Sequence, residues 1–453
     1  MNTIKNTLPL PEVPRLTALK NSFSFYKNPL PLLMEGIGEY GPTYASYLGG
    51  AERIIYTADP GLIQYVLQKN QKNFGKSRLQ TKVLSRFAGK GLLTVEGDYW
   101  RQQRRLIQPG FHKEKLSGLV KIMLSVIEHQ LDILEAKFEK QSVVNISEEM
   151  MEMAFQIVAK SLFSTHTEAK NLKDLSDNIT DIQRFVIKQV RQPLKIPWYY
   201  LSGQFRSADN TATHTRKILQ DFIDLRRQEP GEHHDLLDML LSARYEDTGQ
   251  GMTDTQLVDE SLIFFSAGHE TSANALAWTW YLLAQHPEVI SKIKVEIADI
   301  LGDRSPTFMD LPRLSYTMQV VQESLRLYPP AWIMDRIALA DDEYNGLKIP
   351  KGTMIFPFIY GVHRLPEYWE NPNEFNPDRF EKTKLKERQA YSYLPFGGGP
   401  RMCIGINFAY MEMQLVIIQT LRRMSFSLVN EEEVVPQPLI TLRAAGGVKM
   451  RRI

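Results

Sequence analysis

The spacing of hydrophobic residues predicts a mainly α-helical protein with a small β region. In segments such as 119–138 and 150–163, apolar residues recur three and four positions apart, which is the period of a helix with one buried face. This pattern extends from about residue 59 to residue 302, with breaks near Pro193, Pro197 and Pro230. We therefore expect a helical body over about residues 60–335.

The clearest helix is predicted to begin at Thr253 and to run to His286. The Thr253 hydroxyl can cap the first turn, Gln256 can complete a capping box, and Pro287 follows the last residue. A helix of about 30 residues is long enough to cross a whole domain. We expect this helix to be central to the fold.

Strands are predicted towards both ends of the chain. Segment 43–57 alternates apolar and polar residues around Gly49 and Gly50, which indicates a hairpin of half-buried strands. A second hairpin is expected within 343–356, with Asn345 and Gly346 as its turn, and strand character returns over 438–453. We found no internal repeat or linker, so we expect one domain over residues 1–453. It would have a β-rich part at about 30–60 and β and ligand-binding segments at about 336–453.

The composition narrows the class of protein. Hydrophobic residues make up 43%, charged residues 23%, and 54 Lys and Arg nearly balance 52 Asp and Glu, so a globular protein without a nucleic-acid partner is expected. The first thirty residues lack an apolar stretch for a signal or a membrane span. A single cysteine excludes an internal disulfide and a cysteine-built zinc site. We expect a soluble, cytoplasmic monomer.

Several short motifs fail on inspection. A zinc protease would need a second histidine at Ala273, a P-loop would need glycine at Asn70, and a dinucleotide loop would need glycine at Met402. A c-type haem attachment is excluded because Cys403 has no CxxCH partner.

The segment around the single cysteine carries the strongest chemical signal. Cys403 lies in FGGGPRMCIG, residues 396–405, just before an apolar-periodic stretch that predicts a helix. The partial positive charge at a helix N-terminus favours the thiolate, which is the form that binds iron. The glycines allow a flat macrocycle to approach the backbone. Phe396 could shield the sulfur and Arg401 could pair with a propionate. Without such surroundings, a lone cysteine is usually a small buried apolar residue.

This segment resembles the cysteine signature of the cytochrome P450 family, FxxGxRxCxG, at Phe396, Gly399, Arg401, Cys403 and Gly405. The resemblance implies that Cys403 is the thiolate ligand of haem b, with Phe396, Arg401 and Gly405 beside the cofactor. It also implies the mostly α fold of that family, with a long central helix over the haem and the cysteine loop beneath it. The implied reaction inserts one atom of O2 into a substrate C–H bond, while the other atom becomes water.

In the long helix, AGHETS at 267–272 resembles the oxygen-activation motif of the family. The resemblance implies catalytic roles for Glu270 and Thr271, because a hydroxyl backed by a carboxylate can order the water that relays protons. Ala267 would leave room for the haem. Gly268 weakens a helix, which fits a helix that opens beside a ligand. The alternative for Thr271 is a hydroxyl bonded to its own backbone.

Further basic and aromatic residues resemble the haem-propionate contacts of the family. Trp100 and Arg104, one helical turn apart, resemble its WxxxR motif, although such a pair is more often packing plus a solvated charge. Arg336 follows Pro329 and Pro330 at a position where the family commonly places another propionate ligand. Lys76 is a weaker candidate for the same role.

An acidic and basic pair resembles the structural ExxR motif of the family. Glu323 and Arg326 are three positions apart and can pair on one helix face, with Arg379 of NPDRF as the third member. Taken alone, such a pair is usually a surface ion pair that contributes little stability.

The electron donor and the substrate are less well defined. The resemblance implies separate redox proteins, either a ferredoxin with its reductase or a flavodoxin. Such a partner could dock on a patch of basic residues. The same residues are equally well interpreted as an ordinary solvated helix face. Its members would be Arg101, Arg105, Lys113 and Lys115.

Residues of the substrate pocket are expected by position to be apolar, as core residues would also be. They are Leu93, Ile263, Phe264, Trp332 and Ile333. Glu260 on the same helical stripe would make the outer pocket polar. A fatty acid, a terpenoid, an aromatic compound and a methylated sugar are all compatible, as are hydroxylation and O- or N-dealkylation. The rival functions are a peroxide-driven peroxygenase and a haem sensor or carrier.

Overall fold

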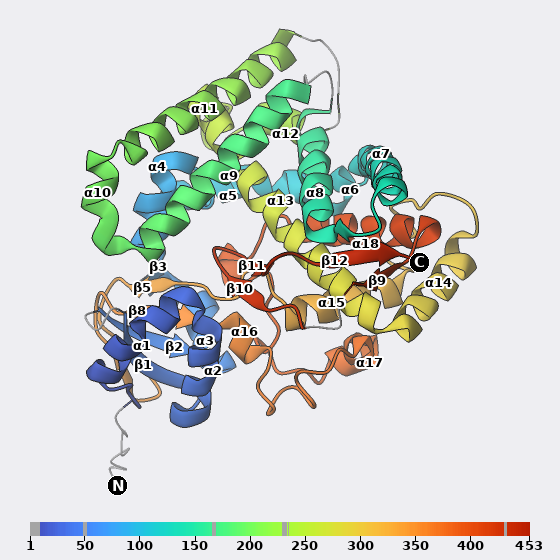
Figure 1. Cartoon of the computed structure of the whole chain (residues 1–453). Coiled ribbons are helices and arrows are strands. Elements are labelled where there is room, and N and C mark those ends of the chain that lie inside the picture. The colour runs from blue at the N-terminus through green and yellow to red at the C-terminus, as the bar shows by residue number, and fades with distance from the viewer. Residues whose placement is uncertain (1–9, 49–51, 165–168, 229–232, 234, 430–432) are drawn as a thin grey trace. The chain divides into compact units, whose positions relative to one another are not determined.

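The computed structural model (Figure 1) describes residues 10–48, 52–164, 169–228, 233, 235–429 and 433–453. The chain divides into two compact units. The first unit comprises residues 1–77, 322–403 and 436–443. The second comprises residues 78–321, 404–435 and 444–453. Helices dominate, as the apolar spacing predicted.

The first unit contains a five-stranded sheet in the order β1-β2-β8-β5-β3. β1 (Thr43–Leu48) and β2 (Glu52–Thr57) form the predicted antiparallel hairpin, whose glycines lie outside the described residues. β2 pairs in parallel with β8 (Met354–Pro357), which pairs with β5 (Arg336–Ala338), and β3 (Phe74–Gly75) forms the far edge.

The prediction of half-buried strands was wrong for β2, which is buried on both faces. Ile55 packs with α3 (Pro60–Gln64) on one face, in a cluster that includes Leu62 and Ile63. Ile54 and Tyr56 pack on the other face with residues of α2 (Pro29–Tyr40). A strand covered on both faces loses the alternation that a half-buried strand shows.

The second predicted hairpin is also present in the first unit. β6 (Asp342–Tyr344) pairs with β7 (Leu347–Ile349), and the two turn residues Asn345 and Gly346 have φ values of 50° and 86°. Positive φ at both positions is what a tight two-residue turn of this kind needs. β10 (Pro436–Pro438) pairs with β11 (Leu442–Ala444) close to the C-terminus.

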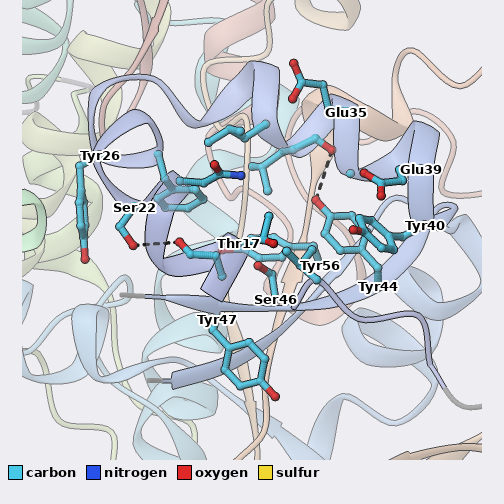
Figure 2. Close-up of a pocket in the computed structure, with 17 residues that line it drawn as sticks. Thr17, Ser22, Tyr26, Glu35, Glu39, Tyr40, Tyr44, Ser46, Tyr47 and Tyr56 are labelled. Carbon is cyan, nitrogen blue, oxygen red and sulfur yellow. Dashed lines mark hydrogen bonds between the residues drawn. The ribbon is translucent and has the colours of Figure 1, made fainter. Parts of the chain in front are cut away.

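The helices of the first unit are mostly short, apart from α1 (Arg15–Lys27) and α2. α1 and α2, together with β1 and β2, line a tyrosine-rich pocket of about 100 Å³ (Figure 2). In this pocket the Tyr44 hydroxyl donates to the Leu33 carbonyl at 3.3 Å. No residue from the predicted active site lines this pocket. The remaining elements are α16 (Ile359–Val362), α17 (Lys382–Leu385), η1 (Tyr65–Lys69), η2 (Gln71–Asn73), η6 (Pro377–Phe380) and η7 (Gly399–Arg401). α15 (Ser315–Leu327) begins in the second unit and ends in the first.

The second unit is built around α13 (Asp254–Gln285), which confirms the predicted long helix. Thr253 and Gln256 form the predicted capping box, and the helix ends at His286. α8 (Ile146–Phe163) packs along α13, with the Phe155 and Phe265 rings 5.7 Å apart. Around this pair lie α5 (Gly97–Ile107), α7 (Leu119–Lys140), α9 (Ala169–Arg191), α11 (Gln204–Gln228), α12 (Leu236–Ser242), α14 (Pro287–Leu301) and α18 (Ile406–Arg423).

Short elements complete the second unit. They are η3 (Leu79–Leu84), α4 (Ser85–Ala88), η4 (Gln108–Phe111), α6 (Lys113–Leu116), η5 (Pro193–Lys195), α10 (Ile196–Leu201) and a sheet of β4 (Val144–Asn145), β12 (Lys449–Arg452) and β9 (Phe426–Leu428). The predicted break at Pro193 follows the end of α9, and Pro230 lies outside the described residues. Pro197 instead occupies the first turn of α10, where a proline needs no backbone donor. Within the described ranges, no helix has the length and apolar character to cross a bilayer.

Gly268 has a different role from the one we expected. α13 is continuous through this position. A β-carbon on Gly268 would lie 3.2 Å from Cγ2 of Val158 in α8, which is tighter than ordinary contact. The glycine therefore allows the two helices to pack closely, and it does not interrupt α13.

Candidate active site

The cysteine loop is held in one conformation by its glycines. Gly397 and Gly399 have φ values of 73° and 68°, which side chains rarely adopt. A β-carbon on Gly399 would also lie 1.9 Å from the Leu67 carbonyl oxygen, so the loop lies directly on the backbone of η1. The Cys403 amide donates to the Phe396 carbonyl at 3.0 Å, while the cysteine itself is exposed. A constrained loop thus presents an accessible sulfur.

Three cationic residues gather near the end of β3. Arg401 donates from Nη1 to the Phe74 carbonyl at 2.7 Å, which ties the cysteine loop to this strand. Arg336 on β5 is buried and donates to the Asp335 carbonyl at 2.6 Å. β3 and β5 pair Gly75 with Ile337, so the next residues in the same register are Lys76 and Arg336. Lys76 is buried as well. Such a group of cations suits an anionic ligand.

Glu323, Arg326 and Arg379 meet in the interior of the first unit. Arg326 Nε lies 2.6 Å from a Glu323 carboxylate oxygen with both side chains fully buried, and Arg379 Nε lies 3.3 Å from the other oxygen. Arg326 also donates to backbone carbonyls of residues 363, 372 and 374. A buried ion pair is tolerated only when its charges are paired and bonded in this way. The pair is therefore not the surface ion pair that the motif alone would suggest.

His363 connects this ion-pair cluster to the chain before the cysteine loop, and sequence reasoning missed it. Its Nε2 accepts from the Leu394 amide at 2.9 Å, so its Nδ1 carries the proton and donates to the Arg326 carbonyl at 3.1 Å. Burial, followed by the nearby Arg326 charge, lowers the pKa of His363 well below its usual value. A neutral histidine therefore supports Leu394, two residues before Phe396. A lone histidine within an irregular segment gives no sequence signal for this role.

The predicted catalytic residues lie in the middle of α13. Glu270 is buried, and Thr271 is partly exposed beside the exposed Ala267. The Thr271 hydroxyl donates to the Ala267 carbonyl at 2.7 Å, which is the alternative considered for this threonine. The hydroxyl oxygen retains lone pairs that can accept a further hydrogen bond.

Two carboxylates of α13 hold the loop that follows α4. Both Glu260 carboxylate oxygens lie 3.0 Å from the Leu92 amide, and Asp259 accepts from the Lys90 amide at 2.7 Å. A β-carbon on Gly91 would lie 2.6 Å from Ile263 Cδ1, so the loop lies flat against α13. Glu260 is buried and bound to the loop, and the polar outer pocket stays a prediction. Leu93 is 39% exposed at the end of this anchored loop.

The other predicted pocket residues make the following contacts within their own units. Phe264 packs edge-on against Phe111, with ring centroids 5.3 Å apart, and lines a cavity of about 440 Å³ to which neither Leu93 nor Ile263 contributes. Trp332 is buried against Phe358 and donates from Nε1 to the Leu439 carbonyl at 3.0 Å. Ile333 packs on the same cluster of the first unit. These contacts give Trp332 and Ile333 a packing role there.

α5 carries the predicted propionate contacts and part of the basic patch. Trp100 is buried, and Arg104 donates to Gln108 at 3.0 Å. The four residues of the basic patch are exposed, although Arg101 pairs with Asp98 at 2.9 Å. Arg105 and Lys115 border the same 440 Å³ cavity as Phe264.

Glu412 on α18 is a second buried residue that sequence reasoning missed. The Ser272 hydroxyl lies 2.6 Å from Glu412 Oε2, and no described residue bonds Oε1. Burial raises the pKa of Glu412 to about 8, partly offset by the Ser272 hydrogen bond. The acid thus lies beside the residue that follows Thr271. The available signal was a charge within an apolar helix, which we did not use.

Comparison with known proteins places the chain in a family. The profile described as Cytochrome P450 matches residues 11–446. The chain belongs to the cytochrome P450 family. This P450 is 32% identical to cyclooctat-9-en-7-ol 5-monooxygenase of Streptomyces melanosporofaciens over 399 residues, which cover 88% of this chain and 85% of the relative. It is also 32% identical to the putative cytochrome P450 132 of Mycobacterium tuberculosis, over 87% of each chain.

The fold of this P450 agrees with that membership. The heme domain in the crystal structure of cytochrome P450DA superimposes with a TM-score of 0.86 at 23% identity, over 99% of this chain and 98% of that one. This similarity confirms the mostly α fold with small sheets that was expected. Family membership and the monooxygenase relatives identify the chain as a cytochrome P450 monooxygenase. The family implies a haem-thiolate cofactor and the use of O2, and the exposed sulfur of Cys403 on its constrained loop fits such a group.

Proposed function

We propose that this monooxygenase binds haem b through the thiolate of Cys403 and hydroxylates a C–H bond of an apolar small molecule. The observation that carries the proposal is that Cys403 is exposed on a loop in which Gly399 has no room for a side chain. When bound, a haem with a cysteinate ligand supplies the iron at which O2 is activated. Residues 1–453 would act as one catalytic domain, which the continuous family match supports.

Several residues that match the motifs of the family would hold the cofactor. Phe396 and Gly405 would flank the sulfur, and Ala267 would leave space above the ring. Arg336 and Arg401, with Trp100 and Arg104, would bind the propionates, because guanidinium groups recognise carboxylates through paired hydrogen bonds. The burial of Arg336 and the anchoring of Arg401 to β3 support this assignment, since the protein itself fixes the position of both cations.

Thr271 and Glu270 would manage the protons that the reaction consumes. Thr271 Oγ1 donates to the Ala267 carbonyl, so its oxygen can accept a hydrogen bond from a water molecule. It could pass on a proton only by releasing the bond to Ala267. Glu270, the adjacent buried acid, would supply the proton that follows.

The substrate is proposed to be hydrocarbon-rich, and terpenoid-like compounds are the first class to test. The name of one relative, cyclooctat-9-en-7-ol 5-monooxygenase of Streptomyces melanosporofaciens, gives an unsaturated alcohol as its substrate and so supports a hydrocarbon-rich compound. The cyclooctatin synthase of the same organism is 29% identical to this chain. The apolar Leu93 and Ile263 beside the anchored loop are compatible with such a molecule. Electrons would come from a ferredoxin and its reductase or from a flavodoxin, which would dock on the exposed basic patch of Arg101, Arg105, Lys113 and Lys115.

The reduced, carbon-monoxide-bound absorption spectrum tests the assignment of Cys403. The wild type should show the red-shifted Soret band of a thiolate ligand, and Cys403→Ser should lose it. Met402→Leu, a change at the exposed neighbouring residue, is the control that should keep it. A thiolate band in Cys403→Ser would disprove the assignment.

Coupling measurements test the proton relay. Thr271→Ala should bind haem normally and release more of the consumed electrons as peroxide. Thr279→Ala is a matched control, because the Thr279 hydroxyl bonds the Ala275 carbonyl at 2.7 Å in the same helix. Equal coupling in the two variants would exclude a specific role for Thr271. Spin-state shifts with terpenoid alcohols, fatty acids and aromatic compounds would then rank the substrate classes.

A further inference from the structure

The cavity of about 440 Å³ in the second unit is lined mainly by residues of α5, η4, α12 and the turn at residues 243–247. We call it the α5–α12 cavity. Its volume is within the range of roughly 300–1,000 Å³ that is usual for small-molecule sites. None of the residues that we assign to haem binding or to proton delivery is among the described residues that line it. The proposed chemistry therefore leaves the α5–α12 cavity without a function.

Part of the lining of the α5–α12 cavity is apolar and closely packed. Phe111 of η4 packs edge-on against Phe264 of α13, with ring centroids 5.3 Å apart. A β-carbon on Gly110 would lie 3.2 Å from Sδ of Met239, so η4 lies directly on α12 at this point. The other large aliphatic residues of the lining come from α5 and α12, and they are Leu106, Ile107, Leu236 and Leu240. This part of the cavity can therefore receive a hydrocarbon or aromatic group.

The turn that follows α12 contributes another part of the lining, and hydrogen bonds fix its conformation. The Tyr245 amide donates to the Gln250 carbonyl at 2.9 Å, and the Gly249 amide donates to the Tyr245 carbonyl at 2.8 Å. Gln256 of α13 donates from Nε2 to the Tyr245 hydroxyl at 3.0 Å. Because the protein itself holds Tyr245 in place, a ligand would meet a largely preformed cavity, as is usual for small-molecule sites.

Three cationic side chains from three separate segments border the α5–α12 cavity. They are Arg105 of α5, Lys115 of α6 and Arg244 of the turn after α12, and all three are exposed. Among the residues that the structure describes, none forms an ion pair with any of them. Arg244 Nη1 donates to the Leu241 and Ala243 carbonyls at 2.7 and 2.9 Å. A guanidinium group has further N–H donors, so Arg244 is held in place and can still bind a ligand.

We propose that the α5–α12 cavity binds a small amphipathic carboxylate, which is a molecule with a hydrocarbon body and one terminal carboxylate. Glu246 and Asp247 also border the cavity, so its lining carries three positive and two negative charges, and one carboxylate would balance the excess. Guanidinium groups bind carboxylates through paired, charge-assisted hydrogen bonds, which favours Arg105 and Arg244 as partners. The apolar lining would bury the hydrocarbon body. This site depends on neither the proposed haem ligand nor the proposed substrate, so either proposal can fail without the other.

Calorimetric titration of the haem-loaded full-length protein with octanoate tests the proposal, and octan-1-ol is the neutral probe of matched length. Octanoate should bind about tenfold or more tightly than octan-1-ol, because hydrogen bonds between charged groups contribute more than neutral ones. Arg244→Gln should weaken octanoate binding by about tenfold and leave octan-1-ol binding unchanged. Ser242→Trp, at an exposed residue that lines the cavity, should block the binding of both probes.

Arg101→Gln is the matched control. Arg101 is an exposed arginine of α5 that is not among the described residues lining the cavity. It belongs to the proposed basic patch, so this variant also separates octanoate binding from the docking of a redox protein. The Soret band, recorded during each titration, reports binding beside the haem.

Three results would overturn the proposal: no binding of octanoate, equal affinity for octan-1-ol, or a loss in Arg101→Gln as large as the loss in Arg244→Gln. The proposal would also fail if octanoate binding always shifted the Soret band and persisted in Ser242→Trp, because the probe would then occupy a site beside the haem.

Discussion

The buried acid Glu412 allows a quantitative prediction about stability and pH. Glu412→Gln removes the titrating group while an amide oxygen can still accept from the Ser272 hydroxyl. Because burial raises the pKa of Glu412 from 4.5 to about 8, the folded protein retains a proton in this range that the unfolded chain releases. The unfolding free energy of the wild type must therefore fall as the pH rises from 4.5 towards 8.

The magnitude follows from the size of the shift. Each pKa unit corresponds to about 1.4 kcal/mol, so the rise from 4.5 to about 8 should lower the unfolding free energy by on the order of 5 kcal/mol across the range. Glu412→Gln lacks that dependence. The unfolding free energy of the variant minus that of the wild type should therefore rise by this amount from acidic pH to pH 8. The amide itself adds a difference in unfolding free energy that does not change with pH.

Urea denaturation of the haem-loaded protein at several pH values would measure the difference. Glu139→Gln is the control, because Glu139 is exposed at the end of α7 and should leave the pH dependence of the wild type intact. Infrared spectroscopy should show a protonated carboxyl band near neutral pH that is absent from Glu412→Gln. If Glu412→Gln and wild type had parallel stability curves from pH 5 to 8, the buried-acid argument would be refuted.

Three further outcomes are expected. Arg326→Lys should lower the unfolding free energy by roughly 3–5 kcal/mol, because it weakens a fully buried ion pair. Arg313→Lys, at a pair whose arginine is 60% exposed, should cost under about 1 kcal/mol. Equal losses in denaturation experiments would contradict this. Since the pKa of His363 is depressed, its stabilising contribution is complete above about pH 6.5 and is lost as the pH falls towards the folded-state pKa. His363→Gln, which can keep both hydrogen bonds, should flatten acid denaturation in that range, and an unchanged curve would argue against the assignment. Glu260→Gln should speed amide hydrogen exchange over residues 89–95 by roughly fivefold or more. The reason is that a neutral amide oxygen binds the Leu92 amide less strongly than a carboxylate does. Unchanged exchange would exclude the anchoring role of Glu260.

Local features of this protein were predictable from sequence. The capping box at Thr253 and Gln256, the Asn345–Gly346 turn and the helical periods depend on neighbours a few residues apart, so their physics is present in any short stretch of chain. The cysteine segment was equally local, since five specified positions lie within ten residues. The same reasoning placed Glu323 and Arg326 on one face of a helix.

Features that join distant segments were decided by the tertiary structure. Burial of β2 on both faces depends on α2 and α3, and Gly268 owes its role to Val158 in α8. Glu412 depends in the same way on Ser272, which lies 140 residues earlier in the chain. The sequence alone determined the family and the helical body, and it pointed to the cysteine that we propose as the haem ligand. Only the folded chain decided which polar groups lose water and which partners they meet, because desolvation and pairing depend on neighbours in space.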